Sequence, residues 1–347
     1  MLNVIPTPTV QTVEPSPVRW SPWIAIGVTA ALLALVPPIA QSLDQPFLIR
    51  VFSRVMVFAV AAVSLNILLG HAGLISVMHA ALLGLGGYTV AILATHADEA
   101  VMTWPFTLPG TRDLLIAAPL AVLVTALASA LLALVALRTR GAYFIMITLA
   151  FNQMLYYLFI SLDKYGGDEG LQVTAPLRVG GSELTDRTTI YYICLVALVG
   201  TLVGVSRLVR SRFGMVVRAA AGNEQRVASV GIAATRYQLV AMTIAGAIAG
   251  LAGVLLVLSQ QFVSPADMAW TRSGELIVMV VLGGTATIWG PVAGAAVFLL
   301  LELVLSGLSI HWQLAFGALI ILMVVFLRSG LSGLVQKLAR QGGSTHG

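Results

Sequence analysis

The sequence has 347 residues, of which 59% are hydrophobic and 10% are charged, and its formal net charge is +5. An ordinary globular domain carries about 25% charged residues, and a soluble core of this length would leave too much apolar surface in water. The composition therefore excludes a soluble protein and predicts an all-α polytopic membrane protein in a lipid bilayer. The basic residues lie between apolar segments and form no aromatic-interleaved face, which argues against nucleic acid as a partner.

The first twenty residues are rich in Pro and Thr and nearly uncharged. They lack the basic stretch followed by an apolar stretch that marks a cleaved signal peptide. We expect residues 1–20 to form a disordered cytoplasmic tail, with Trp20 and Trp23 anchoring the first span at the membrane interface.

Ten membrane spans are predicted from windows of about 20 apolar residues, the length that crosses roughly 30 Å of hydrocarbon. In chain order they cover residues 23–40, 50–69, 74–95, 113–137, 142–162, 190–205, 237–258, 273–288, 291–307 and 311–327. The eighth is short and has Gly283 and Gly284 near its end, so a broken or re-entrant segment is an open alternative there. Residues 21–328 thus form a single membrane domain, followed by a tail of residues 329–347.

The distribution of charge predicts that both termini are cytoplasmic. With the N-terminus inside, the loops assigned to the cytoplasm contain Arg138, Arg140, Arg207, Arg210, Arg212, Arg218, Arg226 and Arg236. The loop of residues 163–189, assigned to the outside, is acidic. The opposite orientation would place nearly all the basic loops outside, against the positive-inside bias.

Polar residues inside the predicted spans are candidates for a substrate path, because such groups at membrane depth face the protein interior or a water-filled route. We select Asn66, Ser76 and Asn152, and the alternative for each is a packing hydrogen bond. Glu275 and Glu302 are the carboxylates that a proton-coupled transporter would use. His71 and His79 have no partner at metal-ligand spacing, and Cys194 is the only cysteine, so no metal site is predicted.

Small residues recur at intervals of three or four in two predicted spans. The third span carries Gly73, Ser76, Ala80, Gly84 and Gly87, and the seventh carries Gly246, Ala249, Gly250 and Gly253. Such stripes let helix backbones approach closely. Helix packing and a role in lining the substrate path are both compatible with them.

The chain has no means of binding ATP through a P-loop. That loop ends in Gly-Lys-Ser/Thr, and the two lysines, Lys164 and Lys337, do not follow a glycine. If transport is driven by ATP, the ATPase is another polypeptide. The basic loop of residues 207–236 is then either a docking lever built from short helices or a solvated loop that only sets the topology.

Six segments resemble, in order, the permeases of branched-chain amino acid ABC importers. They are GHAGLISVMHAALLGLGGYTVAIL (70–93), RGAYFIMITLAF (140–151), YGGDEGL (165–171), RFGMVVRAAAGNEQRVASVGI (212–232), RYQLVAMTIAGAIAGLAGVLL (236–256) and GGTATIWGPVAGAAV (283–297). The form is closer to the larger of the two permeases in such systems. The resemblance implies a translocation subunit in a bacterial inner membrane, not an enzyme.

The resemblance also implies the partners: a second homologous permease subunit, two cytoplasmic ABC ATPases that bind ATP and Mg, and an extracytoplasmic solute-binding protein. This chain would itself hold no cofactor. In the family, the loop matching residues 207–236 is the segment that docks on an ATPase, and it carries Ala219, Gly222, Asn223, Glu224 and Gly231.

The substrate class stays open between amino acids and other small neutral molecules. The chain departs from the family pattern at Met78, Leu82, Gly87 and Gln238, and three of these lie in the third predicted span. Related permeases carry branched-chain or other hydrophobic amino acids, urea or short amides on one scaffold. A proton-coupled secondary transporter is the rival from a different class. A membrane-embedded enzyme would need clustered nucleophiles or metal ligands within the spans, and the sequence shows no such cluster.

Overall fold

The computed structural model describes residues 22–99, 110–285, 287–308 and 311–326. The predicted tails, residues 1–20 and 329–347, lie outside the described residues.

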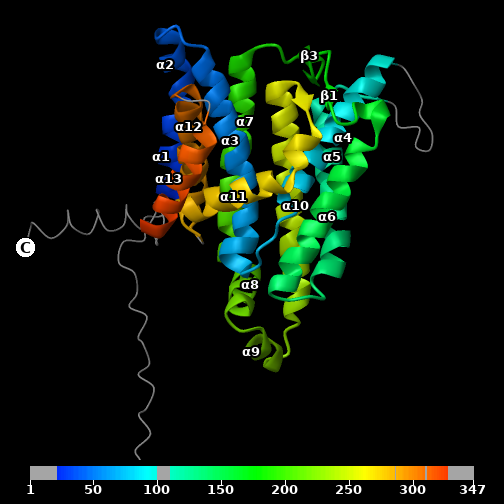
Figure 1. Cartoon of the computed structure of the whole chain (residues 1–347), viewed down its shortest axis with the longest axis vertical. Helices are drawn as coiled ribbons and strands as arrows, with labels where there is room; N and C mark the ends of the chain where they lie inside the picture. The colour runs from blue at the N-terminus through cyan, green and yellow to red at the C-terminus, as the bar shows by residue number, and fades with distance from the viewer. Residues whose placement is uncertain (1–21, 100–109, 286, 309–310, 327–347) are drawn as a thin grey trace, which may run out of the picture.

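The protein is a bundle of apolar helices with very little sheet (Figure 1). Among the described residues, eight helices are long and apolar enough to cross a membrane. The helices are α1 (Pro22–Ala34), α2 (Val36–Ser42), α3 (Phe47–Asn66), α4 (His79–Glu99), α5 (Leu114–Ala136), α6 (Ala142–Ile160), α7 (Arg187–Arg210), α8 (Arg212–Gly222), α9 (Glu224–Ser229), α10 (Ala234–Gln260), α11 (Trp270–Gly283), α12 (Gly290–Leu308) and α13 (Trp312–Phe326). The all-α polytopic class predicted from composition is confirmed.

Helix α3 is the centre of the bundle. It continues into a π-helical turn, η1 (Ile67–Ala72), and most residues of this combined span are buried, whereas most residues of α5 and α6 are not. It contacts α7, α10, α11 and α12. Its sequence is apolar on all sides from Val55 to Val63, as expected of a helix surrounded by other helices.

The small-residue stripes bring α4, α5 and α10 into close contact. A Cβ atom added at Gly86 would collide with the backbone of Gly250, and one at Gly253 would collide with the carbonyl of Leu83. Thr125 of α5 fills the space that a Cβ atom at Gly250 would occupy. Lipid provides no hydrophobic drive between helices, so this close approach supplies van der Waals contact instead.

The eighth predicted span, 273–288, differs from the structure. Helix α11 has 14 residues, which at 1.5 Å per residue is about 21 Å, too short for roughly 30 Å of hydrocarbon. Figure 1 shows it running across the direction of its neighbours. It ends where Gly283 packs on the backbone of Gly290 and Gly284 adopts a positive φ of 109°. The tenth predicted span corresponds to α13, whose apolar stretch, Trp312–Met323, is also short.

Residues 73–78 are irregular backbone between η1 and α4. The N–H groups at the start of α4 are satisfied by side chains of other helices. The pairs are Val77 N with Thr148 Oγ1 at 3.2 Å, Ala80 N with Ser273 Oγ at 3.0 Å, and Ala81 N with Asn152 Oδ1 at 3.2 Å. Interrupted helices are tolerated in membranes where the protein satisfies their backbone in this way.

The strands lie at the end of the bundle opposite α8 and α9 (Figure 1). Strand β1 (Leu171–Gln172) pairs antiparallel with β4 (Phe262–Val263), and β2 (Arg178–Val179) pairs antiparallel with β3 (Ser182–Glu183). Two short helical turns are also present: η2 (Asp163–Tyr165) follows α6, and η3 (Pro265–Met268) follows β4 and contacts α4 and α6.

Candidate functional site

Helices α8 and α9 form a helical hairpin between α7 and α10 at one end of the bundle (Figure 1). The hydroxyl of Ser211 accepts a hydrogen bond from the Gly214 N–H at 3.4 Å and caps α8. The side-chain oxygen of Asn223 accepts one from the Arg226 N–H at 2.9 Å and caps α9. Gly231 follows α9 with a φ of +81°, a conformation that favours glycine. The sequence thus ends one helix and begins the next at Asn223.

A small apolar core holds this hairpin together. Ala220 of α8, Val227 of α9 and Ala234 of α10 are buried against one another, and Val216 and Ile232 pack on them. Burial of apolar side chains is the main stabilising contribution in water. The hairpin is therefore an ordered element fixed to the beginning of α10.

The hairpin also rests on the central helix. Gly73 follows η1 with a φ of +67°, and a Cβ atom built there would lie 3.2 Å from the Cβ of Ala221. A larger side chain at position 73 would push α8 away from η1. Since η1 continues α3, a displacement of α8 bears directly on the most buried helix of the bundle.

An ion pair joins the hairpin to a third part of the bundle. Arg140, in the turn between α5 and α6, donates to a carboxylate oxygen of Glu224 at 3.0 Å. The Arg140 side chain is 70% exposed and that of Glu224 is 23% exposed. A pair so open to solvent contributes at most about 1 kcal/mol to stability. Its effect is on the position of α9 more than on the stability of the fold.

The outer surface of the hairpin carries the predicted coupling residues. Ala219, Gly222, Asn223 and Gly231 are exposed, and Glu224 is half-buried beneath Arg140. Two apolar side chains are also exposed here, Met215 (55%) and Val230 (70%). Exposed apolar groups among arginines suit a protein-binding surface. Met215 and Val230 were not among the coupling residues predicted from the sequence, because composition does not indicate which single side chains of a short helix are exposed.

The three predicted path residues are buried and hydrogen-bonded within the protein, Asn66 and Asn152 to backbone groups and Ser76 to a side chain. Asn66 donates to the carbonyl of Thr287 at 2.8 Å. The Ser76 hydroxyl lies 3.3 Å from Nδ1 of His79. Asn152 donates to the carbonyl of Met268 at 2.9 Å in addition to capping α4. These contacts are those of packing hydrogen bonds, and a place along the substrate path stays a prediction for all three.

Both carboxylates considered for proton coupling are in ion pairs. Glu302 of α12 lies 3.3 Å from Arg54 of α3, and Glu275 lies 2.8 Å from Arg272 within α11. Arg54 and Arg272 also lie over the ring of Phe58. The Arg54–Glu302 pair connects α12 to α3, and the contact of Arg272 with Phe58 connects α11 to α3. Within the described residues, no three His, Cys, Asp or Glu side chains gather as a metal site requires.

Comparison with known proteins identifies the family. Residues 47–327 match the family described as the branched-chain amino acid transport system, permease component. The chain belongs to this family. It is 26% identical, over 297 aligned residues, to the high-affinity branched-chain amino acid transport system permease protein LivM of Salmonella typhimurium and to that of Escherichia coli. In each case the alignment covers 77% of this chain and 67% of the relative. No solved structure matches.

The family match confirms several predictions. The chain is a multi-pass transport permease and not an enzyme, as the resemblance in its six segments implied. The matched residues begin at the start of α3 and end after α13, so they include α8, α9 and α11.

Proposed function

We propose that this chain is a translocation subunit of an ATP-binding cassette importer that carries branched-chain or other hydrophobic amino acids across a bacterial inner membrane. It works with a second homologous permease, two cytoplasmic ATPases and an extracytoplasmic solute-binding protein. The observation that carries the proposal is the folded hairpin of α8 and α9 seated against η1, in a chain of this permease family.

Closure of the ATPases on ATP would displace the hairpin, and the displacement would reach α3 through η1. Alternation between outward-open and inward-open states then follows from the relative movement of packed helices about a substrate site. The ion pair of Arg140 and Glu224 carries the same displacement to the turn between α5 and α6. The hairpin thus contacts Gly73 at the end of η1 and is paired with the turn between α5 and α6 through Arg140.

A urea or short-amide permease of the same scaffold remains the alternative within this fold. A proton-coupled transporter is less well supported, because Glu275 and Glu302 each have an arginine partner.

The test is ligand-stimulated ATPase activity of the assembled transporter. The chain is co-purified with the products of its neighbouring genes, and ATP hydrolysis is measured with a panel of amino acids, urea and short amides. We expect stimulation by branched-chain amino acids. Stimulation by urea or amides alone would show that the substrate is one of these molecules and not an amino acid. ATP-independent uptake coupled to a pH gradient would overturn the ABC assignment.

A further inference from the structure

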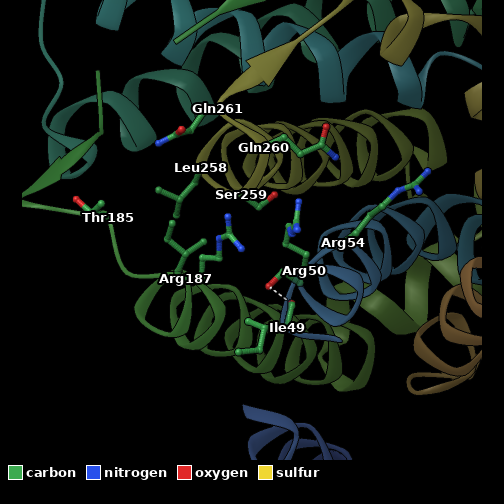
Figure 2. A pocket seen from close by; sticks show the side chains of 11 residues that line it. Ile49, Arg50, Arg54, Thr185, Arg187, Leu258, Ser259, Gln260 and Gln261 are labelled. Atoms are coloured by element: carbon green, nitrogen blue, oxygen red, sulfur yellow. Dashed lines mark hydrogen bonds between the residues drawn. The ribbon is translucent and has the colours of Figure 1, made fainter. Parts of the chain in front are cut away.

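A second feature lies at the end of the bundle opposite α8 and α9. A partly open cavity of about 520 Å³ is lined by the first turns of α3 and α7 and the last turn of α10 (Figure 2). Its volume is within the 300–1,000 Å³ that is usual for small-molecule sites. In the orientation that the charge distribution predicts, this end faces the outside of the cell.

The cavity is positively charged. Arg50, Arg54 and Arg187 line it, and its lining contains no Asp or Glu. Arg54 is paired with Glu302 at 3.3 Å. In the described part of the chain, Arg50 and Arg187 form no ion pair, and Figure 2 shows both side chains directed into the cavity. Two like charges that converge in a recess repel each other and attract an anion.

The acidic residue next to Arg187 in the sequence does not neutralise it. Asp186 precedes Arg187, but its carboxylate caps α7 by accepting from the N–H groups of Thr188 and Thr189 at 3.2 and 3.1 Å. The first turn of α7 adds the partial positive charge of a helix N-terminus on the same side. The electrostatic field in the cavity therefore favours a negatively charged group.

The rest of the lining is amphipathic. Ile49, Ile190 and Leu258 are buried and give the cavity an apolar wall, while Ser259 and Gln260 add side-chain oxygens that can accept hydrogen bonds. A zwitterionic amino acid with an apolar side chain has the matching set of groups: a carboxylate for the guanidinium groups, an ammonium for the oxygens and a hydrocarbon for the wall. A phosphate ion would leave the apolar wall unused.

We propose that this cavity receives the substrate on the outer side, with Arg50 and Arg187 binding its carboxylate. The inference rests on the proposed function, which supplies both the amino-acid substrate and the direction of transport. It also adds a criterion for specificity: urea and neutral amides lack the carboxylate that the two arginines recognise.

The test uses the complete transporter in proteoliposomes with Arg50→Gln and Arg187→Gln. Arg178→Gln is the matched control, because Arg178 lies at the same end of the bundle, outside the cavity, and is paired with Glu183. We expect the maximal rate of ATP-driven leucine uptake to fall roughly tenfold to a hundredfold in each cavity variant, since a hydrogen-bonded charge partner of the carboxylate is lost. The control should keep the wild-type rate.

A second readout separates the substrate from other anionic partners. We expect the concentration of solute-binding protein that half-maximally stimulates ATP hydrolysis to be unchanged in both cavity variants. An increase in that concentration, with full uptake at saturation, would show that the arginines contact the binding protein and would overturn the inference. A loss of uptake in the cavity variants that occurs only in vesicles with anionic lipids would show that the arginines bind lipid phosphates. That result would also overturn the inference.

The two proposals fail in different ways. Wild-type transporter that imports no amino acid would overturn the proposed function and the inference with it. Normal leucine uptake by wild type and by both cavity variants would overturn only the inference. Both substitutions are at exposed side chains, so melting temperatures equal to that of the wild type are expected and exclude misfolding as the cause of a loss.

Discussion

Asn152 shows how a single buried polar residue is used in this permease. Its side chain is fully buried, accepts from the N–H of Ala81 and donates to the carbonyl of Met268. It thereby connects α6, the start of α4 and the turn before α11. In a medium without water, each of these backbone groups would otherwise be unsatisfied.

Replacing Asn152 by Leu is therefore expected to lower the free energy of unfolding by about 2–5 kcal/mol, since it leaves two buried backbone groups without partners. Thermal unfolding in detergent measures the loss. The control is Gln153→Leu at the next position, where the buried side-chain oxygen has no hydrogen-bond partner in the described structure. Equal melting temperatures for the two variants would contradict this account of Asn152.

Glu224 is the residue through which we expect coupling to be most sensitive. Reversing its charge, Glu224→Arg, sets two arginines against each other at the edge of α9. ATP-driven uptake should be lost, while the melting temperature changes little because the pair is exposed. Uptake in proteoliposomes checks the first point and thermal unfolding the second. Unchanged uptake would remove Glu224 from the coupling mechanism.

The charge-swapped variant, Arg140→Glu with Glu224→Arg, locates the effect. Restored uptake would assign the loss to the position of α9 relative to the turn between α5 and α6. A continued loss would assign it to a direct contact of Glu224 with the ATPase.

At the scale of elements, the contact of α4 with α10 depends on the absence of side chains. Gly253 faces the carbonyl of Leu83, and there is no space between them for a methyl group. Gly204 on α7 has nothing within 4 Å of its Cβ position. The two glycines look alike in the sequence and have opposite surroundings in the fold.

Gly253→Ala is expected to destabilise the protein by about 1–3 kcal/mol through overpacking. Gly204→Ala should be neutral or stabilising by up to about 1 kcal/mol, because alanine favours the helix. Melting temperatures of the two variants, measured in the same detergent, test the difference. The packing account would be contradicted if Gly204→Ala were the more damaging of the two.

The same scale shows which elements were predictable. Long apolar runs gave the spans of α5, α6, α7 and α10 to within a few residues, because a run of that length has one stable arrangement in a bilayer. Residues 273–288 are also apolar, and Gly283 and Gly284 near their end left a broken span open as an alternative; α11 ends at these glycines, where Gly283 packs on Gly290 and Gly284 has a positive φ. The direction of α11 across its neighbours could not be predicted, because it depends on packing between distant segments, such as Gly294 of α12 against the carbonyl of Met279.

The candidate site, too, was predictable from the sequence only in part. The sequence left open whether residues 207–236 are a lever of short helices or a solvated loop, and the structure has two short helices there, α8 and α9. The partner of Glu224 is 84 positions away in the chain, and the cavity of Arg50 and Arg187 is built from the ends of three helices. Neither could be read from spacing, because both depend on how the helices assemble.

At the scale of the whole molecule, the bundle has two chemically different ends. One end carries the hairpin of α8 and α9 with its exposed Met215 and Val230. The other carries the cationic cavity and the small strands. The central helix α3 runs between them, from Arg50 in the cavity to the turn that touches α8. In the proposed function, the ATPase would act at one end and the substrate would enter at the other, and α3 connects the two ends.

The most direct test of this account is a cross-link between the hairpin and an ATPase. Cys194, the only cysteine, is buried, so Val230→Cys introduces the single accessible thiol, and Arg178→Cys places one at the opposite end as a control. In transport-competent vesicles treated with a short thiol-to-amine cross-linker, we predict a covalent adduct with the ATPase subunit for Val230→Cys and none for Arg178→Cys. An active transporter in which Val230→Cys gives no ATPase adduct, or in which Arg178→Cys gives an equal one, would contradict the central claim.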